Sequence, residues 1–411
     1  SFLGDVRWPD GRTERRPVFF LGMGHFGQVR RDVGIMPDYG MNIIQIEFGP
    51  RNVIPAEGEF TDDAINNFLE VCDRAAEAGT QVNLLISPHY FPAWALEKWP
   101  HLSDCSGGFL RYCVHAPEAR EVLRRYLQYM IPKIAAHPAL HSICLTNEPV
   151  STDLTNCRFV REDWHAWLRE RYETPERMNA TWGGEHASFE DVPVPDADRR
   201  GEPLVYDFVR FNQQLFAGFH RFLADTIHEM TPEIPVHAKM MICSATTPRS
   251  HGAWSIAPEL FADFCEINGN DAVRWFSDRG EWATSWDCEL MGFDLQRSAR
   301  DAPVFNSEDH LIVDRDVTWV DPWHIYNVYW QGAVHGRGAS TTWVWERTFS
   351  IDASTTGSIL HRPACVEAAG RACLDLNRLA PEVTALERVR PKLAVAYALS
   401  AMLWDDGYHQ R

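Results

Sequence analysis

Short apolar runs alternate with longer amphipathic segments along most of the chain. Apolar side chains recur at helical spacing from Asp62 to Ala78, where Gly79 supplies a stop, and a second helical segment runs from Ala119 to Ala136. Eight candidate strands lie between the helical segments: Val18 to Leu21, Asn42 to Phe48, Gln81 to Ser87, Leu140 to Thr146, Val236 to Ile242, Asn270 to Val273, Pro303 to Ser307 and Ser340 to Trp345. Alternating strands and helices are typical of a parallel sheet, so we predict an α/β fold, a (β/α)8 TIM barrel.

Two segments depart from this alternation. Residues 150 to 210 contain two helical pieces and a polar, proline-rich loop, which we interpret as an insertion after the fourth strand. Near the end, Pro391 introduces the apolar run KLAVAYALSAMLW. We therefore expect a catalytic barrel over residues 1–390 and the first strand of an incomplete C-terminal domain over residues 391–411.

Composition and charge limit the classes of binding partner that we expect. Of the 411 residues, 45% are hydrophobic, and the net charge of -18 would repel a phosphate backbone or an anionic membrane surface, so we expect no nucleic-acid and no membrane partner. No apolar run is long enough to span a bilayer, so we expect a cytoplasmic protein. A secreted or periplasmic location stays open because a chain that starts at Ser1 is compatible with a trimmed leader. The 16 Trp indicate either extra core or a cleft that stacks on flat ligands.

Two glutamates follow apolar strands at the positions where a barrel carries its chemistry. The fourth strand reads HSICLTNEPV and the seventh PVFNSEDHL, which places Glu148 and Glu308 at strand carboxyl ends. These ends meet at one mouth of a barrel, so the two side chains can face each other. Paired carboxylates, one protonated and one ionised, suit glycoside hydrolysis with retention. The alternative is that each glutamate pairs with an arginine at the rim.

A glycine-rich turn offers a competing interpretation. The sequence GMGHFG, from Gly22 to Gly27, follows the first strand, and Glu47 lies 20 residues beyond it, as in a dinucleotide-binding fold. A nucleotide-dependent oxidoreductase is thus an alternative. Against it, Gly34 and Pro37 interrupt the segment that would form the phosphate-binding helix.

Several further segments resemble one glycosidase family in their order and spacing. They are FGPRNVIPAEGEF, SPHYFPAWALEKWP, FLRYCVHAPEARE, WHAWLRERYETPERMNATWGG, YDFVRFNQQLFAGFHRFLADTIHEMTPEIPVH and WQGAVHGRGASTTWVWER. From about residue 40 to 390 the chain resembles the family 42 glycoside hydrolases, which are β-galactosidases of the retaining barrel clan. The resemblance implies a retaining, exo-acting β-glycoside hydrolase that needs no cofactor and acts on an oligosaccharide or glycoside. It also implies a homotrimer.

The resemblance assigns roles residue by residue. It makes Glu148 the acid/base, Glu308 the nucleophile and Asn147 the ligand of the substrate 2-hydroxyl. Arg111 matches an arginine of the sugar pocket, and Trp182 matches a tryptophan at its rim. A surface ion pair is the alternative for Arg111.

Aromatic and imidazole side chains near the strand ends complete the predicted sugar site. Trp319, Trp343 and Trp345 lie beside strands seven and eight, where an indole can stack on a pyranose. Trp343 and Trp345 are two residues apart in a predicted strand, so we expect them to share a face and Trp345 to form the base of the sugar site. Packing in the core is the alternative. His89 and His310 follow strands three and seven and are candidates for binding sugar hydroxyls, unless they are structural histidines.

The chain also departs from the family pattern. The family often carries a cysteine cluster after the acid/base that binds structural zinc, and only Cys157 stands in that stretch here, so we predict no metal. The glutamate and histidine that usually grip galactose after strand eight have no clear counterpart in FSIDASTTGSILHRP. A β-mannoside or β-galactofuranoside substrate therefore stays open, as does a non-catalytic sugar-binding barrel.

Overall fold

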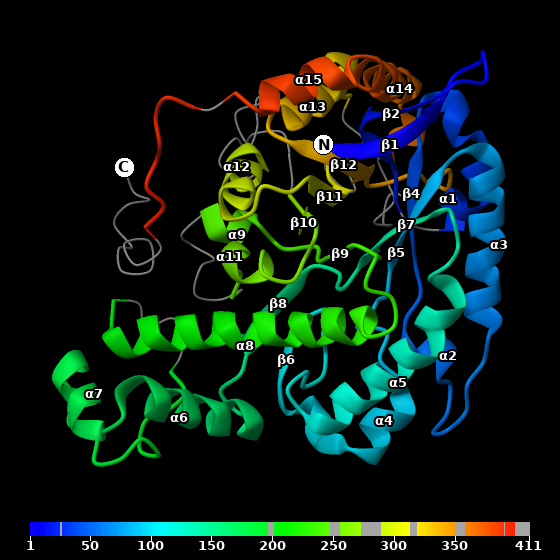
Figure 1. The fold of residues 1–411 in the computed structure, drawn as a ribbon. Coiled ribbons are helices and arrows are strands. Elements are labelled where there is room, and N and C mark those ends of the chain that lie inside the picture. The colour runs from blue at the N-terminus through cyan, green and yellow to red at the C-terminus, as the bar shows by residue number, and fades with distance from the viewer. Residues whose placement is uncertain are drawn as a thin grey trace.

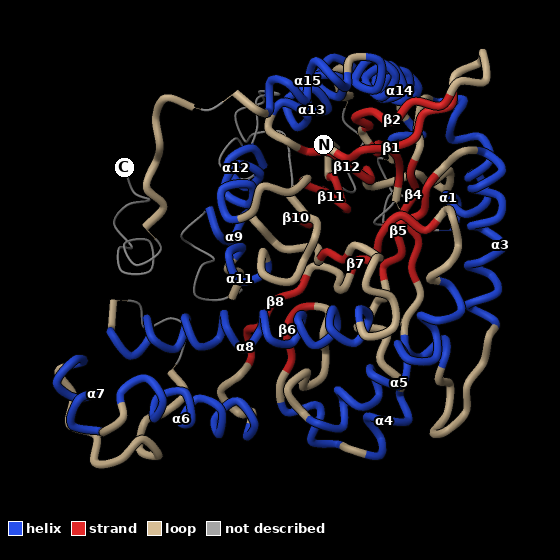
Figure 2. The backbone as a smooth tube through the Cα atoms, viewed as in Figure 1, coloured by secondary structure: helices blue, strands red, loops and turns tan. Residues whose placement is uncertain are grey.

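The core of the protein is an eight-stranded parallel sheet that helices surround (Figures 1 and 2). The computed structural model describes residues 1–24, 27–195, 201–246, 255–272, 289–312, 319–349, 358–389 and 391–398. In spatial order the strands are β10 (Asn268–Asn270), β11 (Val304–Asp309), β12 (Arg337–Thr342), β3 (Phe20–Met23), β4 (Ile43–Glu47), β5 (Gln81–Leu85), β7 (Leu140–Cys144) and β9 (Val236–His237). All eight predicted strands contribute to it, so the predicted (β/α)8 barrel is confirmed.

The seam of the barrel lies between β9 and β10. There the backbone N–H of Asp271 donates to the carbonyl of Met240 over 2.9 Å. A Cβ at Gly269 would lie 2.4 Å from the carbonyl oxygen of Ala238, so only glycine allows the two strands to approach this closely. β9 is shorter than the predicted run to Ile242.

Helices form the outer layer, as Figure 1 shows for α3, α5, α13 and α14. The described helices are α1 (Gly27–Asp32), α2 (Pro50–Val53), α3 (Asp63–Ala78), α4 (Ala93–Lys98), α5 (Pro117–Ile134), α6 (Arg158–Tyr172), α7 (Pro175–Trp182), α8 (Pro203–His228), α9 (Cys243–Thr246), α11 (Pro258–Phe261), α12 (Glu289–Ala299), α13 (Pro322–Val334), α14 (Pro363–Arg378) and α15 (Ala380–Glu387), with 3-10 turns η1 (Val33–Tyr39), η2 (Pro100–Asp104) and η3 (Ile359–His361). Within the described part of the chain, none of them combines the length and apolar character that a membrane span requires.

The barrel interior is layered. Ile43, Phe305 and Ala339 come from three different strands yet pack together, so they point inward. Farther along the strands the interior is polar: the Asn83 amide accepts from Gln45 over 2.7 Å and donates to Nε2 of His237 over 3.0 Å. These hydrogen bonds link β4, β5 and β9 across the interior, and the side chains above this layer reach the mouth.

A hairpin that we did not predict covers the opposite end of the barrel. β1 (Phe2–Arg7) pairs antiparallel with β2 (Thr13–Val18). The Phe2 ring packs edge-on against Phe20 and His141, at centroid distances of 5.5 and 5.0 Å. The hairpin therefore covers the end of the barrel at which the strands begin, and the end at which they finish lies opposite it.

The predicted insertion begins with a short strand and continues into helices. β8 (Pro149–Asp153) pairs antiparallel with β6 (Ser106–Gly108), and α6, α7 and the first part of α8 follow. At the other end of the chain, residues 391–398 form no helix or strand, and Leu393 and Val395 are exposed. The rest of the predicted C-terminal strand lies outside the described residues.

The glycine-rich turn has a structural explanation. A Cβ at Gly22 would lie 1.7 Å from the Ile43 carbonyl oxygen, so β3 and β4 need a glycine there. α1 spans only six residues, and Glu47 accepts hydrogen bonds from Ser87 Oγ at 2.7 Å and from the Tyr90 hydroxyl at 2.8 Å. A dinucleotide fold requires an open sheet with a crevice at its switch point. The closed barrel therefore gives the oxidoreductase interpretation no support.

Buried histidines should make stability depend on pH. Burial lowers the pKa of His220 to about 4, while an unfolded histidine titrates near 6.5. Between these values the unfolded chain binds the proton and the folded chain does not, so stability falls as the pH falls, by up to about 1.4 kcal/mol per pH unit for each such histidine. We expect His220→Gln to flatten the decline of Tm between about pH 6.5 and 4 in thermal denaturation.

The solvent-accessible His186 provides the control. His186→Gln should keep the wild-type slope. An unchanged slope in His220→Gln would contradict this account.

Candidate active site

Asn147 and Glu148 lie in the turn between β7 and β8. Glu148 has φ +37°, a conformation that few residues other than glycine adopt. Such backbone strain costs on the order of 1–3 kcal/mol and persists where the surroundings impose it. Here the chain must leave the barrel strand and at once pair β8 with β6. The turn places the half-buried Glu148 carboxyl at the barrel mouth.

Glu308 lies in β11 and is almost fully buried. One carboxylate oxygen, Oε2, accepts from the ammonium of Lys239 at 2.5 Å. The other, Oε1, lies 3.5 Å from Nε2 of His310. Lys239 follows β9, is completely buried and also donates to Oδ1 of Asn147 over 2.8 Å. The ammonium therefore joins the fourth-strand turn to the seventh strand.

A third carboxyl group, that of Asp271 after β10, completes the site. Burial, together with the nearby charge of Glu308, raises the pKa of Asp271 well above its usual value, which favours the protonated form. Neither of its side-chain oxygens has a hydrogen-bond partner among the described residues. Side-chain atoms of Glu148, Asp271, Glu308 and His310 all lie within 4.8 Å of one another.

This geometry suits double displacement at a sugar carbon. Two carboxyl groups about 5–5.5 Å apart allow one to attack the anomeric carbon while the other protonates the leaving oxygen. One oxygen of Glu148 and one of Glu308 lie within 4.8 Å of each other, which is nearer the separation typical of retention than the roughly 6.5–9.5 Å typical of inversion.

Four of the predicted sugar ligands, His310, Trp343, His89 and Asn147, lie at or beside these groups. The His310 ring lies 5.8 Å from that of Trp343. His89 lies close enough to Glu308 and Lys239 to feel their charges, and burial lowers its pKa to about 4, so its imidazole is neutral. Asn147 contacts Lys239, as described above. Each can face a bound sugar.

The remaining predicted ligands are exposed or lie elsewhere. Arg111 is exposed, and the ion pair that was the alternative to a sugar-binding role is not seen among the described residues. Trp319, just before α13, is 68% exposed. Trp182 packs in the insertion, where its indole N–H donates to Asp207 over 2.9 Å, and α7 lies at the outer end of α8 (Figure 1). The single chain therefore does not bring Trp182 to the carboxyl groups.

The expectation for Trp345 is wrong. Its indole N–H donates to Asp32 Oδ2 over 2.9 Å, and its ring packs against Tyr39, so it is a core residue. The predicted alternation with Trp343 assumed a strand as far as Trp345, but β12 ends at Thr342. Beyond that point the two side chains need not share a face.

Sequence reasoning missed Lys239 and Asp271. Lys239 stands inside the apolar run VHAKMMI, and a charge in a buried strand was the available signal. Asp271 follows a three-residue strand that has little periodicity. Only the closed barrel brings Lys239 and Asp271 beside the two glutamates and so indicates a role for them.

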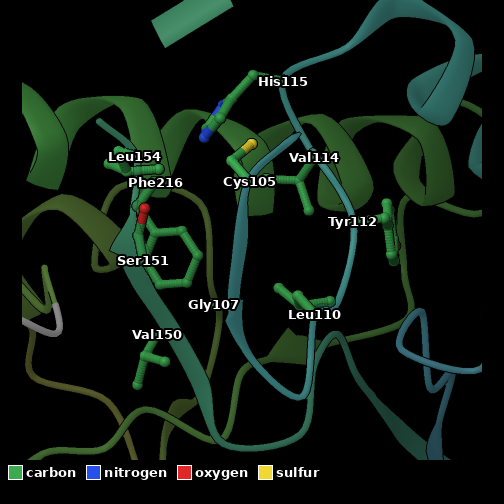
Figure 3. A pocket seen from close by; sticks show the side chains of 10 residues that line it. All are labelled: Cys105, Gly107, Leu110, Tyr112, Val114, His115, Val150, Ser151, Leu154 and Phe216. Carbon is green, nitrogen blue, oxygen red and sulfur yellow. The ribbon is translucent and has the colours of Figure 1, made fainter. Parts of the chain in front are cut away.

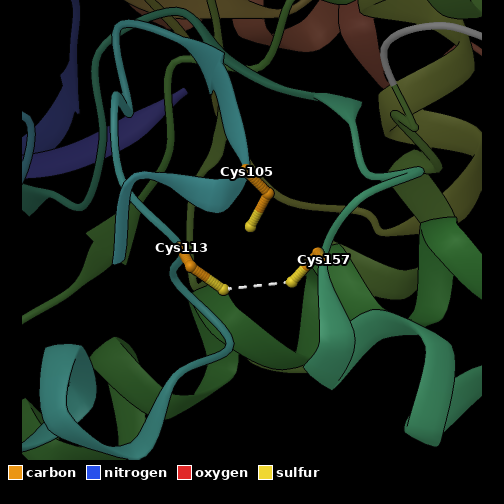
Figure 4. A group of neighbouring side chains, drawn as sticks. All are labelled: Cys105, Cys113 and Cys157. Atoms are coloured by element: carbon orange, nitrogen blue, oxygen red, sulfur yellow. Dashed lines mark hydrogen bonds between the residues drawn. The ribbon is translucent and has the colours of Figure 1, made fainter. Parts of the chain in front are cut away.

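Three cysteines gather at the far end of the small β6–β8 sheet (Figure 4). Sγ of Cys113 lies 3.3 Å from Sγ of Cys157, and Cys105 completes a group whose sulfurs lie within 4.8 Å of one another. Hydrogen bonds from Cys105 and Cys113 lower the pKa of Cys157, which favours a thiolate there.

This cluster changes the expectation of no metal, which rested on Cys157 alone. Thiolates bind zinc tetrahedrally, and three converging sulfurs fit three of its four positions. His115 lines the adjoining cavity with Cys105 (Figure 3), and burial lowers its pKa to about 4, so its imidazole is in the neutral, metal-binding form. Zinc held there would brace the β6–β8 sheet.

We expect wild-type protein produced with zinc to keep about one zinc ion per chain through dialysis, as measured by atomic emission. Cys113→Ser should lose most of it, whereas Cys72→Ser, which removes a buried thiol of α3 outside the cluster, should not. Wild-type protein free of zinc after this treatment would overturn the assignment.

Comparisons with known proteins show which family the sequence matches. The family model described as beta-galactosidase, glycoside hydrolase family 42, matches residues 25–267, more than half of the chain. A beta-galactosidase of Arthrobacter sp. is 25% identical over 257 residues, which cover 56% of this chain and 35% of that relative. One of Halorubrum lacusprofundi is 23% identical over 322 residues, covering 70% and 43%. The chain thus spans well under half the length of these curated relatives.

Solved structures show the same fold. The exo-carrageenase of family 42 from Bacteroides ovatus superposes with a TM-score of 0.82 at 23% identity, covering 95% of this chain and 56% of that one. The Halorubrum lacusprofundi beta-galactosidase gives a TM-score of 0.69 at 19% identity, covering 86% and 57%. Taken with the match to the family model, the barrel and its paired glutamates lead to one assignment: the chain belongs to glycoside hydrolase family 42.

Proposed function

We propose that the protein is a retaining, exo-acting β-glycoside hydrolase of the β-galactosidase type. The observation that carries the proposal is the approach of the Glu148 and Glu308 carboxyl oxygens to within 4.8 Å at the barrel mouth. Glu308 attacks the anomeric carbon, and the bond to the leaving oxygen breaks as Glu148 gives that oxygen its proton. Glu148 then takes a proton from water, whose oxygen displaces Glu308 and restores the β configuration.

The environments of the two glutamates support these roles. Glu308 accepts from a buried ammonium, which favours the carboxylate that a nucleophile needs. Glu148 is only half-buried, so its carboxyl can exchange a proton with water between the two steps. The raised pKa of Asp271 favours its protonated form, in which it adds no further negative charge and can donate to a substrate hydroxyl.

The sugar is proposed from the relatives. The curated relatives are named beta-galactosidases, which makes a terminal β-galactoside the first substrate to test. The neighbour from Bacteroides ovatus is named an exo-carrageenase, so carrageenan oligosaccharides belong in the same panel. β-Mannosides and β-galactofuranosides join them because the galactose ligands after strand eight have no clear counterpart in this chain.

We expect purified protein to release the aryl group from an aryl β-galactoside faster than from the matching manno, gluco, fuco, arabino and galactofurano compounds. The assay is absorbance of the freed phenol, with aryl α-galactoside as the control. Highest activity on another β-glycoside would change the sugar and keep the mechanism. Binding without release from any substrate would favour a non-catalytic sugar-binding barrel.

Azide can separate the two glutamates, because it acts as a nucleophile without needing a base. With an activated aryl β-glycoside, Glu148→Ala should recover turnover in azide and yield the β-glycosyl azide, since azide attacks the glycosyl-enzyme. Glu308→Ala should lose on the order of 10³-fold or more in kcat and yield only the α-glycosyl azide, because azide then attacks from the vacated face.

Proton NMR of the products distinguishes the two anomers. The converse stereochemistry would exchange the roles of the two residues. Near-normal activity in either variant without azide would remove that residue from the mechanism.

A further inference from the structure

Lys239 is a buried cation that bonds to two groups of the proposed mechanism at once. Its side chain is fully buried, and its ammonium donates to Glu308 Oε2 at 2.5 Å and to Asn147 Oδ1 at 2.8 Å. We propose that Lys239 is a positioning residue that sets both the charge of the nucleophile and the direction of the Asn147 amide. The inference rests on the proposed function and adds a residue that no sequence motif assigned to the site.

The amide orientation follows from the chemistry of lysine. An ammonium has only donors, so the group of Asn147 that faces it must be the oxygen. The Asn147 NH2 group is then directed away from Lys239 and is available as a donor. A substrate 2-hydroxyl placed there would receive a hydrogen bond whose geometry Lys239 maintains.

The charged groups around Glu308 also support a role for Lys239. Burial opposes the charged form of Lys239, but Glu308 and other neighbours outweigh it, and the pKa of Lys239 is raised. The titratable groups that face the pair are Glu148 after β7, Asp271 after β10, His310 after β11, His89 after β5, and Cys144 and His237 in the strands. Burial lowers the pKa of His237 to about 3 and of His89 to about 4, so both are neutral. Among these groups, only Lys239 and His310 can place positive charge beside Glu308.

This pairing acts oppositely on the two steps. While Glu308 is a carboxylate, the ammonium stabilises it and restrains its attack. When Glu308 forms the glycosyl ester, it loses its negative charge and the ammonium loses its partner. When water then displaces Glu308 from the sugar, the carboxylate forms again and the ammonium stabilises its charge. Lys239 therefore favours breakdown of the glycosyl-enzyme.

The test uses Lys239→Met, which keeps the length of the side chain without charge, and Lys239→Gln, which keeps a donor without charge. Lys133→Met, at a surface ion pair of α5, is the matched control. An opposite charge within about 4–6 Å lowers a carboxyl pKa by about 1–3 units. In both Lys239 variants we therefore expect the acid limb of the kcat/KM profile, where kcat/KM falls as Glu308 is protonated, to lie about one to three units higher in pH than in wild type.

Two further measurements separate positioning from a loss of fold. Above the acid limb, kcat should fall more than kcat/KM, because the glycosyl-enzyme accumulates. In Lys239→Met the preference for the parent glycoside over its 2-deoxy analogue should fall about tenfold, the equivalent of one hydrogen bond. Lys239→Gln should retain part of this preference, and in an Asn147→Ala background Lys239→Met should not reduce it further.

An unshifted acid limb with an unchanged 2-deoxy preference in an active Lys239→Met protein would overturn the inference. If His310→Gln shifts the limb and Lys239→Met does not, His310 sets the charge instead. If wild-type protein hydrolyses no glycoside, the proposed function fails, but the inference is still read directly: carbon-13 NMR of labelled glutamate, assigned with Glu308→Gln, should show a higher Glu308 pKa in Lys239→Gln than in wild type. Equal pKa values would reject it.

Discussion

Closure of the parallel sheet is the constraint on which the site depends. β9 and β10 are two and three residues long, and the backbone hydrogen bond from Asp271 to Met240 joins them at the seam. Lys239 and Asp271 emerge on either side of this seam, and Glu148 and Glu308 reach the same space from β7 and β11. An open sheet with the same strands would leave these four residues apart.

Closure also creates an electrostatic problem that the chain solves locally. Charges in a buried site cost free energy unless each has a partner. The site holds three carboxyl groups and one buried ammonium. Glu308 pairs with the ammonium, the pKa of Asp271 is raised in favour of its protonated form, and Glu148 lies where water can reach it. The different surroundings of three similar acids thus separate their chemical roles.

The sequence predicted the parts of the molecule that repeat. Apolar runs located all eight strands, and the polar residues that end them located Glu148 and Glu308. It did not predict Lys239, whose charge inside an apolar run was the one signal available, or Asp271, because the strand before Asp271 is too short to show a period. We expected Trp345 in the sugar site because the sequence pattern predicts a strand as far as Trp345, whereas the strand ends at Thr342. Cys105 and Cys113 lie far from Cys157 in sequence, and only the pairing of β6 with β8 brings them together.

That pairing also links two parts of the molecule that have different chemistry. β8 starts directly after Glu148 and ends close to Cys157, so a single strand connects the proposed proton donor to the thiol cluster. The strained backbone of Glu148 and the three thiols thus lie at the two ends of one five-residue strand, so the register of β8 against β6 sets the position of both.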